Sequence, residues 1–97
     1  GILAKAGCKV SIITDSSVVP QDTLALMAGL AIKAGMEPFA ALQSITINPA
    51  RHIGVEDRVG SIEAGKDADI IISKESIFTL DSGIVTVLIN GQPVPLA

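Results

Sequence analysis

The sequence predicts an α/β fold whose sheet is incomplete, and three observations indicate this. Apolar residues make up 48% of the chain and are mostly aliphatic, with two Phe and no Trp or Tyr, a composition typical of strands that helices cover on both faces. Apolar residues recur at helical spacing over residues 24–32, and Asn90-Gly91 separates two apolar runs, which is a strong hairpin signal. The strands are too few for an ordinary sheet, which has about five.

The N-terminal elements are a helix end and one strand. Residues 2–6 fit the last turn of an amphipathic helix, and Gly7 is placed to stop it. The β-branched run Val10–Ile13 predicts a buried strand, and residues 14–20 predict a loop.

Three helices are expected next. The first covers residues 24–32, with Asp22 as its predicted cap and Gly35 as its stop. A second opens at Glu37-Pro38, because Pro is tolerated in the first turn of a helix. A third is predicted from Asn48-Pro49 to Gly54, with Asn48 as its cap.

The remaining residues predict short strands. A short extended piece is expected between Gly60 and Gly65, followed by a strand at Ile70–Ser73. The stretch GIVTVLINGQPV predicts a strand, a turn at Asn90-Gly91 and a return strand. We therefore expect two parts, residues 1–57 and 58–97, neither of which has a complete sheet.

Composition and charge exclude several classes of function. The net charge of −3 and the near absence of aromatic residues argue against nucleic-acid binding. No apolar run reaches the roughly 20 residues that a membrane span needs. Cys8 is alone, so no internal disulfide can form, and we expect a buried thiol and a cytoplasmic setting.

Three stretches together resemble one family. GILAKAGCKVSIITD, ALQSITINPARHIGVEDRVGSIEAGKDADIII and VLINGQPV are similar, in this order, to the C-terminal portion of the amidohydrolase superfamily, and within it to imidazolonepropionase-like metal-dependent hydrolases. The resemblance implies a (β/α)8 TIM barrel, with Val10–Ile13 as its last strand followed by its helices. It also implies that residues 58–97 are the C-terminal strands of a small composite β-sandwich domain.

Asp15 is the candidate catalytic residue and metal ligand. Active sites of such barrels lie at the C-terminal ends of the strands, and Asp15 follows directly on the predicted strand. The resemblance implies that this aspartate binds a divalent metal, by default zinc, and shuttles a proton during hydrolysis of a C–N bond in a cyclic amide, an amide or a deamination substrate. The alternative reading is an Asx-turn residue, since Asp favours such loop positions.

Two further polar residues, Ser16 and His52, are of interest as contacts of such a site. Ser16 is a candidate substrate contact, although related sequences often have His at this place, which leaves the substrate open. His52 is the chain's single histidine, and we interpret it as a partly exposed helical residue and not as a ligand.

One aspartate cannot hold a metal, because catalytic zinc sites use about three protein ligands. We therefore expect no metal in the isolated 97-residue chain, and a catalyst only together with the remainder of the same polypeptide and a small-molecule substrate. The alternative hypothesis is a stand-alone, non-catalytic domain that forms a homo-oligomer through its open strand edges.

Overall fold

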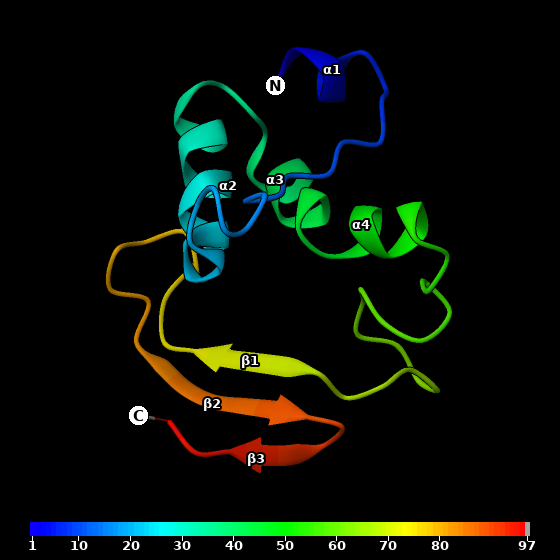
Figure 1. Ribbon diagram of the computed structural model, residues 1–97, viewed down its shortest axis with the longest axis vertical. Coiled ribbons are helices and arrows are strands. Elements are labelled where there is room, and N and C mark those ends of the chain that lie inside the picture. The colour runs from blue at the N-terminus through cyan, green and yellow to red at the C-terminus, as the bar shows by residue number, and fades with distance from the viewer. Residues whose placement is uncertain (97) are drawn as a thin grey trace.

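The computed structural model describes residues 1–96, in which helices precede a small sheet. The helical elements are α1 (Ile2–Lys5), the 3-10 helix η1 (Gln21–Thr23), α2 (Leu24–Lys33), α3 (Pro38–Ser44) and α4 (Ile47–His52), and the strands are β1 (Ile70–Ser73), β2 (Ile84–Ile89) and β3 (Gln92–Val94). The helices occupy one half of the molecule and the sheet the other, with β1 nearest the helices (Figure 1). Within residues 1–96, no helix has both the length and the apolarity required to cross a bilayer.

The ends of the predicted helices are confirmed where glycine or a carboxylate defines them. α2 ends in a Schellman motif, because Gly35 has a φ of +105° and the N–H groups of Gly35 and Met36 donate to the carbonyls of Ile32 and Ala31. At the start of α3, the carboxylate of Glu37 accepts the N–H groups of the second and third helical residues at 3.0 and 2.9 Å.

Two predicted caps are wrong. Asp22 lies inside η1, and the residue that precedes α2 is Thr23, whose side chain makes no capping bond. Asn48 lies within α4, which starts one residue earlier after Thr46. Asn48 is buried and uses its side chain for a contact with a distant segment, so tertiary packing overrides the local capping preference.

The core is small and consists mostly of small side chains. Ala28, Met36 and Ala41 are its buried centre, and they bring α2 and α3 together. Partly buried residues pack around them: Ala4, Val10, Ile12, Ala31, Ile32, Ala40, Ile45 and Phe78. Phe78 comes from the loop between β1 and β2, so this loop reaches the helical half.

The predicted strand at Val10–Ile13 does not form as a strand. Within residues 1–96 it has no partner in the sheet, which contains only β1, β2 and β3. A strand needs a neighbour to satisfy its backbone groups, and this segment instead hydrogen-bonds to the helices. Cys8, just before it, is exposed, contrary to the expected buried thiol.

The sheet is an antiparallel meander in the order β1-β2-β3. Ile70 pairs with Leu88 and Val87 pairs with Val94. Asn90 and Gly91 form the two-residue turn, with φ values of +54° and +76°, as the sequence predicts. No strand forms between residues 60 and 65, where turns and bends at residues 56–61 and 64–66 leave only residues 62 and 63 for the expected extended piece.

Many large apolar side chains are exposed. Ile2 is 87% exposed, Ile62 84% and Leu80 99%. An open groove of about 1250 Å³ lies between the last two helices and β1, with Leu42, Val59 and Ile70 among the residues that line it. The radius of gyration is 13.8 Å, against about 12.5 Å for a compact domain of this length. The described residues therefore leave unusually much apolar surface uncovered.

Candidate functional site

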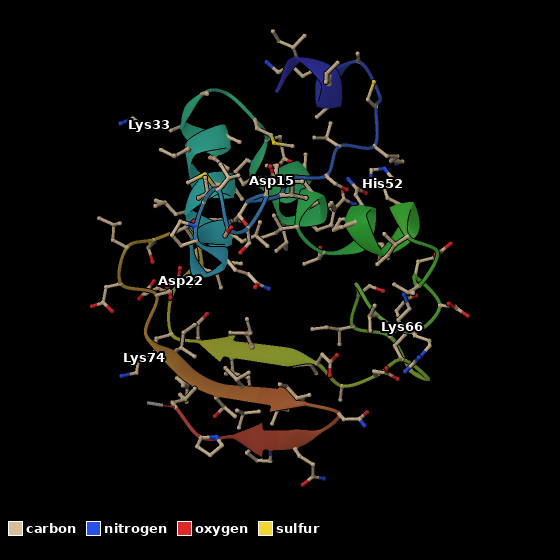
Figure 2. The ribbon with its side chains drawn as sticks, viewed as in Figure 1. Asp15, Asp22, Lys33, His52, Lys66 and Lys74 are labelled. Carbon is tan, nitrogen blue, oxygen red and sulfur yellow. The ribbon has the colours of Figure 1, made fainter. Side chains whose placement is uncertain are left out.

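Asp15 lies in a turn that follows the segment of residues 10–14. Its φ is +52°, a left-handed conformation that Asp tolerates better than most residues, and its carbonyl accepts the N–H of Val18 at 2.7 Å. The residue is exposed, and neither ion pair found within residues 1–96 involves its carboxylate. Figure 2 shows Asp15 in the helical half of the molecule. The carboxylate is therefore accessible to a ligand from outside.

Two hydrogen bonds connect the segment before Asp15 to the helices. The N–H of Ile12 donates to the carbonyl of Ser44 at 2.9 Å, and Nδ2 of Asn48 donates to the carbonyl of Val10 at 2.9 Å. Asn48 is 6% exposed, and its Oδ1 is buried without a hydrogen-bond partner among the described residues. The sequence does not indicate this contact, because an Asn before a Pro is also the usual signal of a helix cap.

His52 lies on α4 and contacts the same segment. Its Nδ1 is 2.6 Å from Oγ of Ser11, and both atoms belong to residues outside the core. The prediction of an exposed helical histidine is therefore confirmed, with a contact to Ser11 that the sequence did not indicate. In Figure 2, His52 projects from α4.

The described residues do not by themselves form a metal site. Ser16 is exposed in the same turn as Asp15. No group of three or more His, Cys, Asp or Glu residues lies close enough together within residues 1–96 to hold a metal ion. Because a catalytic zinc site uses about three protein ligands, these residues can supply one ligand and not a complete centre.

A second polar cluster lies in the loop before β1, away from Asp15 (Figure 2). Nζ of Lys66 is 2.6 Å from Oγ of Ser61 and 3.0 Å from Oε2 of Glu63. The hydrogen bond that Ser61 donates to Glu63, together with the Lys66 ammonium, holds the pKa of the Glu63 carboxyl below its usual range. The cluster satisfies its own charges, as expected for a structural turn.

The neighbouring residues of the same loop bind the hairpin turn. Oδ1 of Asp69 accepts the N–H of Asn90 at 2.8 Å, and the carbonyl of Ala68 accepts the N–H of Gly91 at 2.9 Å. Arg58 and Asp67 form an ion pair at 2.8 Å. The stretch EAGKDAD therefore has an architectural role, because its charged and backbone groups hold the loop against the hairpin turn.

Curated relatives match most of the chain. An adenine deaminase of Latilactobacillus sakei is 39% identical over 90 residues, which is 88% of this chain and 14% of that protein. An adenine deaminase of Methanothermobacter thermautotrophicus is 34% identical over 96 residues, covering 95% of this chain and 16% of that protein. The chain thus spans less than a fifth of the length of these relatives.

Solved structures are also similar to most of this chain. An amidohydrolase from Thermotoga maritima superposes with a TM-score of 0.89 at 36% identity, over 95% of this chain and 24% of that one. An N-acetylglucosamine-6-phosphate deacetylase from Pasteurella multocida superposes with a TM-score of 0.61 at 23% identity, over 88% and 22% of the two chains, which supports the fold alone. The model of the amidohydrolase family matches residues 1–94. This chain belongs to the amidohydrolase family.

Proposed function

We propose that this chain is the C-terminal portion of a metal-dependent amidohydrolase that hydrolyses a non-peptide C–N bond. The match to the family over residues 1–94 carries the proposal. The adenine deaminase relatives favour deamination of an aminopurine as the reaction. The likeness to imidazolonepropionases stays a prediction, and the relatives reported above add nothing to it.

In this proposal Asp15 is one ligand of a divalent metal, by default zinc, and the remainder of the polypeptide supplies the other ligands. When bound, the metal lowers the pKa of water toward neutrality. The Asp15 carboxylate would accept a proton from the water that attacks the substrate carbon, and would then donate this proton to the departing nitrogen. Its exposure and its lack of an ion pair within the described residues support this role. Ser16, next to it, is the proposed substrate contact.

The exposed apolar surface supports the proposal that this chain functions together with the remainder of the polypeptide. The large apolar side chains on the helices and sheet, and the groove between them, are surfaces that a barrel and a composite β-sandwich domain would cover. The same surface also favours the second candidate function, a non-catalytic domain that self-associates. Sedimentation of the purified 97-residue chain separates them, since a stable, metal-free homo-oligomer would favour the second.

The test of the catalytic proposal is Asp15→Asn in the full-length protein. We expect loss of bound metal and a fall of at least about 100-fold in ammonia release from adenine, because both proton transfer and a ligand are removed. Asp22→Asn is the matched control, because this substitution makes the same change in charge. Asp22 is also exposed, and it lies in η1. Equal activity and metal content in both variants would refute the role of Asp15.

A further inference from the structure

The segment that leads to Asp15 is fixed by few hydrogen bonds, beside the packing of Val10 and Ile12 against the core. Residues 10–14 belong to no strand within the described part of the chain, so the regular ladder that would fix them is absent there. Their hydrogen bonds to the helices are those of Val10, Ser11 and Ile12 described above. Apart from its packing against the core, the position of the segment thus rests on one carbonyl of α3 and two side chains of α4.

Two of these contacts replace a neighbouring strand. In extended backbone, the C=O of one residue and the N–H two residues later point to the same edge. Here the C=O of Val10 accepts from the side chain of Asn48, and the N–H of Ile12 donates to the backbone of Ser44. The side-chain N–H of Asn48 and the backbone carbonyl of Ser44 therefore supply the donor and the acceptor that a neighbouring strand would supply along this edge.

Asp15 is close enough to these contacts to depend on them. It lies three positions after Ile12, which is a reach of about 10 Å even in a fully extended chain. Asn48 is held firmly in turn, because it is 6% exposed and lies inside α4. A buried amide inside a helix is a rigid support for the strand-like segment.

We propose that Asn48 is a positioning residue for Asp15. Its Nδ2 holds the carbonyl of Val10 and thereby fixes where the turn begins that presents the Asp15 carboxylate. The inference rests on the proposed function, in which Asp15 binds a divalent metal. Groups that hydrogen-bond a metal ligand directly typically change metal affinity by about 10- to 100-fold when they are removed. Asn48 binds the backbone five positions before Asp15, so we expect an effect at the lower end of that range.

The variants are Asn48→Ala and Asn48→Leu, with Ser44→Ala as the matched control. Asn48→Leu keeps the branched shape of the side chain but removes its polar atoms, and a cavity of about 120 Å³ beside Asn48 gives the larger Leu side chain room. Ser44 is fully buried and its Oγ donates to Ala41 at 2.6 Å, so its loss weakens α3. The bond from Ile12 goes to the backbone carbonyl of Ser44, which Ala retains.

Two measurements on the full-length protein decide the matter: hydrogen exchange of the Ile12 amide, and affinity for Zn²⁺ alone in competition with a chelator. In both Asn48 variants we expect exchange at least about 10-fold faster and Zn²⁺ affinity about 10-fold weaker than in Ser44→Ala. Exchange or affinity equal to that of Ser44→Ala in both variants would overturn the positioning role. If Asp15→Asn itself leaves Zn²⁺ affinity unchanged, the proposed function fails, and the role of Asn48 toward the metal fails with it.

Discussion

Gly60 is the position where a single added methyl group should destabilise the fold most clearly. Its φ is +97°, and a Cβ built on it would lie 2.8 Å from Cβ of Ala50 and 3.0 Å from Cα of Ile47. Both neighbours belong to α4, so the chain passes directly over this helix. The closest approach is far inside the ordinary contact distance of about 3.5 to 4.0 Å between carbon atoms.

The cost of Gly60→Ala has two parts. A residue with a Cβ at this φ carries a backbone strain of about 1 to 3 kcal/mol. Overpacking against the backbone and Cβ atoms of α4 adds about 1 to 3 kcal/mol, because a short helix fixed by its neighbours cannot move away freely. The sum, about 2 to 6 kcal/mol, is a large fraction of the 5 to 15 kcal/mol that stabilises a typical protein.

Gly65→Ala separates the two parts. The φ of Gly65 is +92°, close to that of Gly60, but a Cβ there would meet no atom within 4 Å. Urea unfolding of both variants, followed by circular dichroism, should show Gly60→Ala less stable than Gly65→Ala by about 1 to 3 kcal/mol. Equal losses in the two variants would refute the close approach of residue 60 to α4.

Two further predictions concern polar contacts. Replacing Glu37 with Ala should lower the free energy of unfolding by about 1 kcal/mol, because two N–H groups at the start of α3 lose their acceptor. Glu37→Gln should lower the free energy of unfolding by less, since its amide oxygen still accepts. Urea unfolding of both variants measures these losses. For Glu63, the lowered pKa means that its contribution to stability is present above its ordinary pKa of 4.5 and is lost as the pH falls through the lower folded value. Ser61→Ala removes the largest cause, so NMR titration should find the pKa of Glu63 raised toward the ordinary value, and an unchanged pKa would contradict this assignment.

Local patterns predicted the elements whose stabilising groups are local. The start of α3 and the stop of α2 depend on residues within one helical turn, and the Asn90-Gly91 hairpin depends on the turn itself. Ile70–Ser73 was predicted with its observed bounds, because its apolar run is flanked by charged turn residues. Such signals are contained in short windows of sequence, so they need no knowledge of the tertiary structure.

The errors came from residues whose partners are distant in the chain. Asn48 has the local signature of a cap but binds Val10, which is 38 residues away. Val10–Ile13 has the composition of a strand, but strand formation requires a neighbour, and none occurs among the described residues. Asp15 was found only through the family resemblance, since an aspartate after an apolar run is equally typical of an ordinary turn.

The placement of Phe78 has a consequence for how the molecule unfolds. Its ring, carried by the loop between β1 and β2, packs against the core centred on Ala28, and the backbone of this loop lies next to Gly29 of α2. Unfolding of the sheet would remove the Phe78 ring from the core. The buried centre of that core, Ala28, Met36 and Ala41, would then be more exposed to solvent. Because the helices contact mainly one another and the strands mainly one another, the Phe78 ring is a main apolar link between the two halves. Unfolding of the sheet is therefore expected to destabilise the helices largely through loss of this ring from the core.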